Sequence, residues 1–255
     1  MNILFIGDIV GRPGREYILS HLGQIRNEVK ADICIANGEN VSHGNSITEA
    51  HVRELWGAGI DVFTLGNHTF NRNMTNVFDS FQNIVRPANY SKTLPGEGSL
   101  VFDAGRYRVG VVNVQGQVFL DPIDSPFTAV MREIEKIKEE SDVILVDFHA
   151  EATSEKGAMG YFLDGKVTAV VGTHTHVQTA DERILPNGTA FISDVGMTGV
   201  RESVLGTKKE IIVNRFAYQQ KDRFELAEGE VQFNAVLISA DPETGKAIEI
   251  KRIQK

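Results

Sequence analysis

Two histidines in the segment VVGTHTHVQ, residues 170–178, carry side chains that commonly bind metal ions. His174 and His176 flank one threonine at the end of an apolar run. In an extended chain, side chains two residues apart point to the same face. The pair could therefore bind one ion, bind two different ions, or lie at a strand end without any ligand.

Other polar side chains also follow apolar segments, each at the point where its segment ends. They are Asp8, Glu39 and Asn40 in NGEN, Asn67 and His68 in GNH, and His149. Taken alone, each could be a turn residue or a histidine hydrogen-bonded to the backbone. Ligands of open α/β sheets bind at the carboxyl ends of the strands, however. Carboxylate, carboxamide and imidazole groups suit first-row divalent metals, so the recurrence favours a metal site.

The segments that must position these residues alternate between apolar runs and amphipathic patterns. Strands are predicted at 2–7, 31–37, 60–66, 142–149 and 166–174, and helices at 14–29, 46–59 and 125–140. Ser46 and Glu49 have the spacing of a capping box for the second helix. This alternation predicts an α/β fold. Further strands at 98–105, 107–115, 188–196, 230–241 and 246–254 predict two sheets packed together.

Two further segments are interpreted as structural. GRPG, residues 11–14, is glycine-rich and follows a strand, but it lacks the G-K-[ST] of a phosphate-binding loop, which indicates a tight turn into a helix. The charges of SEKGAMGYFLDGK, residues 154–166, are predicted to lie on a solvated helix face and turn. His21, His43 and His51 are predicted to be helix-surface or loop residues.

The composition indicates one globular domain covering residues 1–255, since no repeat or long linker interrupts the chain. A net charge of -8 argues against a long nucleic-acid partner but not against a small phosphate ligand beside a metal. Cys34 is the one cysteine and is predicted to be buried. The amino-terminal segment lacks a signal-peptide pattern and no window is long and apolar enough for a membrane span, so a cytoplasmic location is expected.

The series Asp8, Glu39, GNH, His149 and GTHTH resembles the motifs of the calcineurin-like metallophosphoesterases. The resemblance is closer to the bacterial YmdB-type phosphodiesterases. It runs nearly from end to end, through GDIVGRPGR, NGEN, TLGNHT, RPANY, DFHAEATSEK and the segment from YFLDGK to GMTG. This resemblance implies a four-layer αββα sandwich of two mixed β-sheets flanked by helices.

The resemblance also implies the roles of the site residues. One metal would be held by Asp8, Glu39, Asn40 and His176, and a second by Glu39, Asn67, His149 and His174, with the Glu39 carboxylate bridging. His68 would bind no metal and would act as the proton donor. The resemblance further implies that the two metals are iron or manganese, and the mixed nitrogen and oxygen ligands fit either without choosing between them.

Two positions depart from the pattern of the wider superfamily. Val10 stands where a histidine ligand is usual, and Asn40 is expected to fill the place of that ligand. Thr69 stands where an acidic residue usually orients the catalytic histidine. The sequence therefore names no partner for His68.

The expected reaction is hydrolysis of small cyclic nucleotides, the 2′,3′-cyclic ones being favoured by the resemblance and 3′,5′-cyclic ones remaining open. A metal-bridging hydroxide would attack the phosphorus, and His68 would protonate the leaving oxygen. Two alternatives remain: a metal-dependent phosphomonoesterase, and a nucleotide-sensing regulatory protein with vestigial activity. A homo-oligomer is expected only from the general frequency of symmetric assemblies.

Overall fold

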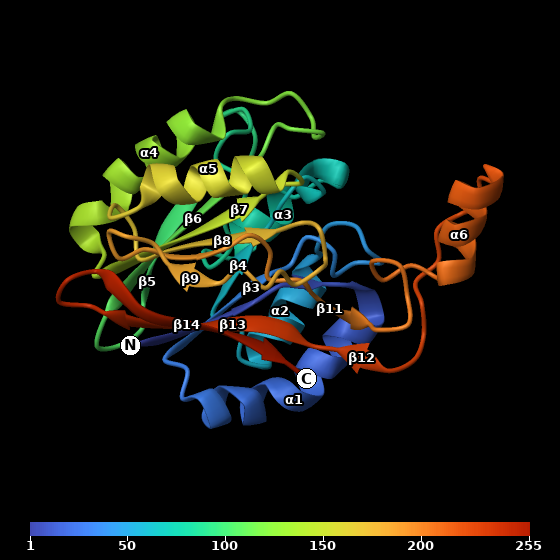
Figure 1. Cartoon of the computed structure of the whole chain (residues 1–255), viewed down its shortest axis with the longest axis horizontal. Coiled ribbons are helices and arrows are strands. Elements are labelled where there is room, and N and C mark those ends of the chain that lie inside the picture. Colours follow the sequence, from blue (N-terminus) through green and yellow to red (C-terminus); the bar gives the residue numbers. More distant parts are fainter.

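The computed structural model describes all of residues 1–255 and contains two large mixed sheets with helices packed against them (Figure 1). One sheet has five strands in the order β14 (Lys246–Gln254), β13 (Asn234–Asp241), β1 (Asn2–Ile6), β3 (Ile33–Asn37) and β4 (Val62–Thr64). Strands β1, β3 and β4 are parallel, whereas β13 is antiparallel to both of its neighbours. The carboxyl ends of β1, β3 and β4 consequently meet at one edge of this sheet.

The second sheet has six strands and supplies the other side of that edge. Its order is β5 (Ser99–Asp103), β6 (Arg108–Gln115), β7 (Val143–His149), β8 (Ala169–Thr173), β10 (Ala190–Ile192) and β9 (Arg183–Ile184). The four central strands are parallel and the two edge strands are antiparallel to them. His149 pairs in register with Thr173, so β7 and β8 end at the same level.

A small third sheet joins distant parts of the chain. It contains β12 (Val231–Gln232), β11 (Met197–Val200) and β2 (Asp8–Ile9). Because β2 pairs in parallel with β11, Asp8 lies opposite Met197. The sequence analysis did not anticipate this sheet.

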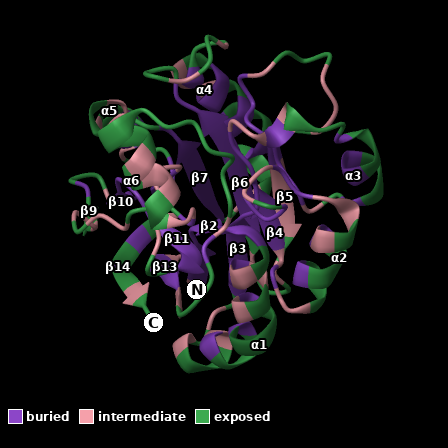
Figure 2. Cartoon of the chain, turned by 90° about the vertical axis from the view of Figure 1, so that its right-hand side faces the viewer, coloured by how far each residue is buried: buried purple, intermediate pink, exposed green.

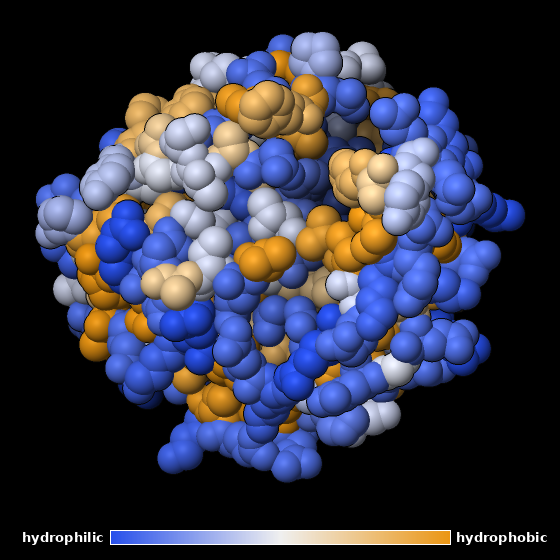
Figure 3. Space-filling model, turned by 45° about the vertical axis from the view of Figure 1, so that its right-hand side comes forward, coloured by the Kyte–Doolittle hydropathy of each residue, from blue (hydrophilic) through white to orange (hydrophobic).

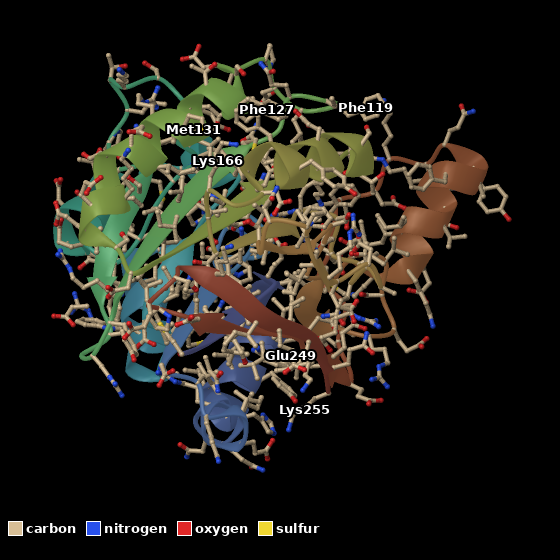
Figure 4. The ribbon with its side chains drawn as sticks, turned by 60° about the vertical axis from the view of Figure 1, so that its left-hand side comes forward. Phe119, Phe127, Met131, Lys166, Glu249 and Lys255 are labelled. Carbon is tan, nitrogen blue, oxygen red and sulfur yellow. The ribbon has the colours of Figure 1, made fainter.

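Five of the six α-helices cover the outer faces of the two large sheets. They are α1 (Gly11–Val29), α2 (Glu49–Gly57), α3 (Thr75–Ser80), α4 (Pro126–Ile137) and α5 (Thr153–Leu163). The sixth, α6 (Lys209–Tyr218), projects away from the sheets, and η1 (Thr69–Asn71) and η2 (Lys138–Glu140) are short 3₁₀ helices. Residues from α1, α2 and α3 share one buried cluster with the five-stranded sheet, and residues from α4 and α5 share another with the six-stranded sheet. Edge-to-face packing of Phe127 on Phe162 joins α4 to α5, and Lys166 lies over the Phe162 ring (Figure 4).

A third buried cluster fills the space between the two sheets. Side chains such as Ile3 and Phe5 of β1 meet Val111 of β6 and Leu145 of β7. Alternate residues of each strand face this space and the residues between them face the helices, as the period of a strand requires. Burying each of these large apolar side chains contributes about 1.5–3 kcal/mol. The predicted α/β class and the presence of more than one mixed sheet are confirmed.

Several local predictions need correction. The second helix exists, but the predicted capping box is wrong: α2 begins at Glu49 and its N-cap is Thr48, whose hydroxyl accepts the His51 N–H at 3.4 Å. Ser46 is instead buried, and its hydroxyl donates to the Thr69 carbonyl. The predicted solvated charges of residues 154–166 are wrong at Lys156, which is 1% exposed.

Three further features can be compared with the sequence analysis. GRPG is the first turn of α1 rather than a turn before it, because α1 already begins at Gly11, which has φ +59° and follows β2 after one residue. Cys34 is fully buried, and burial raises the pKa of its thiol. None of the helices combines the length and apolarity that crossing a membrane requires.

Candidate metal centre

The eight predicted site residues lie together where the carboxyl ends of the parallel strands of both large sheets meet. Asp8 begins β2 just after β1, and the turn after β3 carries Glu39 and Asn40. The segment after β4 carries Asn67 and His68, β7 ends at His149, and β8 is followed by His174 and His176. Asp8, Glu39 and His149 have no exposed surface, although charged residues are rarely buried without a partner.

One group of contacts surrounds the Nε2 atom of His149. The Oε1 atom of Glu39 and the Oδ1 atom of Asn67 each lie 2.9 Å from it, and the Nδ1 atom of His174 lies at 3.1 Å. A single ring nitrogen has either one hydrogen or one lone pair, so it cannot satisfy three such neighbours. Oxygen and nitrogen atoms that converge without enough hydrogens between them are suited to hold a cation.

A second group of contacts surrounds the side-chain amide of Asn40. Its Nδ2 atom lies 3.0 Å from Asp8 Oδ1, 3.2 Å from His176 Nε2 and 3.3 Å from Glu39 Oε1. An amide nitrogen carries two hydrogens, so this group also has more acceptors than donors. A carboxamide binds cations through its oxygen, so metal binding at this position requires the Asn40 amide to turn.

The two groups share Glu39 and otherwise contain different residues. Their members are the two ligand sets that the family resemblance implies, and the Oε1 atom of Glu39 belongs to both groups. The ligand atoms of Glu39, His149 and His174 all lie within 4.8 Å of one another. The donor chemistry of both groups therefore fits divalent transition metals.

Hydrogen bonds to the other ring nitrogens fix which atoms face the centre. The Nδ1 atom of His149 lies 2.8 Å from the hydroxyl of Thr173, which donates to Asp147 at 2.7 Å. His149 must therefore donate from Nδ1, which leaves Nε2 free as a ligand. The Nδ1 atom of His176 likewise lies 3.1 Å from the Leu205 carbonyl, so its Nε2 atom also faces the centre.

Electrostatics favours a positive charge at this place. Burial opposes protonation of His149, but Glu39, Asp8 and Asp147 outweigh it and raise the His149 pKa to about 9. Burial also disfavours the ionised form of Asp8, yet contacts with His176 and His149 hold the Asp8 pKa below its usual range. A cation bound here would replace the positive charge of the His149 proton.

The two histidines of VVGTHTHVQ owe their directions to a turn rather than to a strand. β8 ends at Thr173, and His174 and His176 have φ values of 100° and 63°. The expectation that both imidazoles point to the same face because they lie two residues apart in a strand is therefore wrong. The Thr175 N–H donates to Asp194 at 3.0 Å, and Asp194 forms a 2.7 Å ion pair with Lys156. Both charged residues are 1% exposed, so a buried ion pair anchors the turn between the histidines.

His68 is held by groups that the sequence analysis did not identify. Its backbone N–H donates to Glu39 Oε2 at 2.9 Å, and its Nδ1 atom lies 2.9 Å from the Nδ2 atom of Asn71. Asn71 Nδ2 also donates to Asn45 Oδ1 at 2.8 Å. Thr69 does not contact the His68 ring in this way, because its hydroxyl donates to the Gly66 carbonyl. The only signal in the sequence was a second amide residue in NHTFN.

Glu151 was also missed by the sequence analysis. Its Oε2 atom lies 3.1 Å from His174 Nε2, whereas His149 contacts the other nitrogen of that ring. An acceptor at Nε2 leaves Nδ1 of His174 directed at the centre. Its position two residues after His149 in DFHAE was the available signal.

The fold and this convergent set of donors define a protein of the phosphoesterase type. Residues 4–253 match the model of the YmdB-like protein family. The chain belongs to this family, which confirms the resemblance derived from the motifs.

Three relatives show how far the similarity extends. The chain is 45% identical over 254 residues to a 2′,3′-cyclic-nucleotide 2′-phosphodiesterase of Bacillus subtilis (strain 168), covering 99% of this chain and 96% of that protein. A crystal structure of a hypothetical protein from Thermus thermophilus superposes with a TM-score of 0.93 at 39% identity, covering 100% and 99% of the two chains. A structure described as a novel phosphatase from Mycoplasma pneumoniae gives 0.93 at 36% identity, with 100% and 93% covered.

Proposed function

We propose that this protein is a metal-dependent phosphodiesterase that hydrolyses small 2′,3′-cyclic nucleotides. The observation that carries the proposal is the convergence of two donor groups on Glu39, with His68 beside them. The substrate class follows the Bacillus subtilis relative, a 2′,3′-cyclic-nucleotide 2′-phosphodiesterase that aligns over nearly the whole chain.

We propose that two metal ions bind here. One set of ligands comprises Asp8, Glu39, Asn40 and His176, and the other comprises Glu39, Asn67, His149 and His174. The nitrogen and oxygen donors suit iron or manganese. Bound ions would neutralise phosphate charge and acidify a water molecule.

His68 supplies the proton in the proposed reaction. Its ring stands next to the donor groups because its backbone N–H is tied to the Glu39 carboxylate. The Nδ1 atom faces Asn71, which leaves Nε2 without a protein partner and available to the leaving oxygen. General acid catalysis of this kind contributes about 10²–10⁴-fold. The general acid is the charged ring, which carries a hydrogen on both nitrogens. The Asn71 amide would then turn so that its oxygen accepts from Nδ1, and that bond would persist in the neutral ring left after Nε2 gives up its proton.

The decisive experiment replaces His68 with alanine and measures both metal content and hydrolysis of 2′,3′-cyclic AMP. We expect turnover to fall about 10²–10⁴-fold while the metal content stays at the wild-type level. His43→Ala is the matched control, because His43 is an exposed loop histidine outside both donor groups. Undiminished turnover in the metal-loaded His68 variant would refute its role.

A phosphomonoesterase is the second candidate, since one similar structure is described as a phosphatase. Comparing 2′,3′-cyclic AMP with 3′-AMP at equal concentration separates the two activities. Faster release of phosphate from 3′-AMP than opening of the cyclic diester would favour the phosphatase. Including 3′,5′-cyclic AMP tests whether the ring size is selected.

We also infer that residues 1–255 form one domain with four layers. The inter-sheet cluster and the two helix–sheet clusters support this inference, because each lies between a different pair of adjacent layers.

A further inference from the structure

An arm formed by residues 201–226 contacts the body at its base, through Leu205, Gly206 and Leu226, and carries α6 at a tip that stands away from the body (Figure 1). None of the ten residues of α6 is buried, which distinguishes it from the other five α-helices (Figure 2). Isolated helices shorter than about 12–15 residues are marginal in water, so most helices depend on packing. The arm therefore has a surface that the single chain leaves without a partner.

The arm is nevertheless well organised at its base. The Lys208 N–H donates to the Glu225 carbonyl at 2.9 Å, and bridges join Thr207 to Val204 and Leu226. The Arg215 guanidinium lies 4.7 Å from the centre of the Phe224 ring. These contacts hold α6 outward and away from its own body.

The exposed side of α6 is apolar along one stripe. Ile212, Val213 and Phe216 follow the i, i+1, i+4 spacing that places side chains on one helix face. Phe216 is 82% exposed and Val213 is 54% exposed. Figure 3, which brings this side of the molecule forward, shows apolar atoms exposed among hydrophilic ones. Such a stripe is typical of a helix that packs into a groove.

The body offers a groove of about 820 Å³ between α1 and the segment that follows the arm. Its apolar lining includes Pro13, Tyr17 and Val231. Of its charged residues, Arg12 is paired with Glu16, Lys255 with Glu28 and Glu230 with Arg201, whereas Glu228 has no cation within ion-pair distance. The groove thus combines apolar walls with an unpaired negative charge.

Charge identifies the partner. The arm has six basic and four acidic residues, so its net charge is +2 in a chain whose total is -8. The rest of the chain therefore carries -10. A positive apolar arm and a negative apolar groove on the same chain are complementary between two copies. A two-fold axis would make the contact twice, because each copy contributes one arm and one groove.

We propose that the protein forms a dimer in which α6 of each copy docks, through Ile212, Val213 and Phe216, in the groove beside Tyr17 of the other copy. This assembly is independent of the proposed catalytic function. It also gives the arm the packing that an exposed ten-residue helix lacks.

Light scattering after size exclusion, at low and high micromolar protein, tests the assembly. We expect a dimer for the wild type and a monomer for Phe216→Asp. The variant should still fold and melt cooperatively, because Phe216 is 82% exposed within one chain. Its melting temperature should lose the dependence on protein concentration that dimerisation gives the wild type. The matched control is Trp56→Asp on α2, a residue that is 52% exposed and outside the arm. That variant should remain a dimer.

Cross-linking tests which surfaces meet. The sole native cysteine, Cys34, is buried, so any disulfide between copies must involve the introduced cysteines. The double variant Phe216→Cys, Tyr17→Cys should form a disulfide-linked dimer on mild oxidation, and each single variant should not. A monomeric wild type would overturn the proposal. If that monomer binds vesicles of anionic lipid through the arm, the partner of α6 is a membrane surface and not a second copy. Equal cross-linking by Phe216→Cys alone would show arm-to-arm contact and would also overturn it.

Discussion

At the scale of single residues, Asn71 is the side chain that contacts Nδ1 of His68, the proposed proton donor. The amide contacts Nδ1 of His68 at 2.9 Å and is itself held by Asn45. The amide nitrogen can donate to an unprotonated Nδ1, and after a half-turn the amide oxygen can accept from a protonated one, whereas a carboxylate can only accept. We therefore propose Asn71 as a positioning residue for His68.

Asn71→Ala should lower kcat about tenfold to a hundredfold, since it frees the His68 ring and forfeits part of the general-acid contribution. KM and metal content should stay close to wild type, because Asn71 contacts neither donor group. Steady-state kinetics with 2′,3′-cyclic AMP and metal analysis provide the readout. Asn71→Asp should restore most of kcat, because a carboxylate also holds the ring.

The matched control for that prediction is Asn73→Ala. Asn73 lies in the same segment, but its side chain caps the Thr75 N–H instead of contacting His68. If Asn73→Ala loses as much kcat as Asn71→Ala, the effect comes from the segment as a whole and not from the His68 contact.

Replacing one or the other histidine of VVGTHTHVQ should empty a different one of the two proposed metal positions. His176→Ala should mainly empty the group around Asp8 and Asn40, and His174→Ala the group around Asn67 and His149. The donor distances support this split, because His176 contacts Asn40 and His174 contacts His149. Anomalous scattering from crystals of both variants measures occupancy at each position. Equal loss of both metals in both variants would contradict the split.

At the scale of elements, the turn after β8 depends on a charge pair from two other parts of the chain. Lys156 lies on α5 and Asp194 follows β10, and together they hold the Thr175 N–H between the two histidines. A buried ion pair adds little net stability compared with apolar residues, but breaking one partner leaves a buried charge uncompensated. This turn is therefore sensitive to a single substitution outside the donor groups.

Lys156→Met should destabilise the protein by about 3–5 kcal/mol, the usual cost of stranding one member of a buried pair. The variant should also lose metal, because Asp194 no longer anchors the turn. Denaturant unfolding and metal analysis measure the two effects. Lys166→Met is the control, since Lys166 is exposed just after the carboxyl end of α5. A stability equal to wild type would contradict the cost expected for leaving Asp194 without its cation.

The element scale also shows how far the sequence could predict the structure. Strands such as β3 and β7 were recognisable as short, nearly continuous apolar runs, and the helix α4 by its apolar periodicity. The turn geometry of His174 was not, because it depends on Lys156 and Asp194, which are 38 residues apart. Likewise, α6 was not predicted, because it is only ten residues long and has no buried face within one chain.

At the scale of the whole molecule, the two large sheets bring together donors from five segments of the chain. Their identities could be predicted, because each follows a recognisable strand and the family motifs mark them. The hydrogen-bond partners around these donors could not be predicted. Contacts such as Thr173 to Asp147 and His68 to Asn71 depend on how the segments lie in space rather than on residue type.

The charge gathered at this place couples metal binding to pH. In the metal-free protein, Glu39, Asp8 and Asp147 overcome burial and raise the His149 pKa from 6.5 to about 9. A raised pKa means that the proton on His149 stabilises the metal-free fold. This stabilisation is complete below the unfolded value of 6.5 and is lost as the pH rises through about 9. A metal ion must displace the same proton, so metal binding weakens as the pH falls.

Both effects act in the same direction on the difference in melting temperature between the metal-loaded and metal-free forms. Between about pH 6.5 and about pH 9, the chelated protein should become less stable while the manganese-loaded protein gains from tighter binding. The difference should therefore widen with pH, and scanning calorimetry with and without chelator measures it. His149→Gln should flatten that widening, because glutamine has no proton to exchange. A gap that is constant or narrows with pH in the wild type would show that His149 is neutral in the metal-free protein.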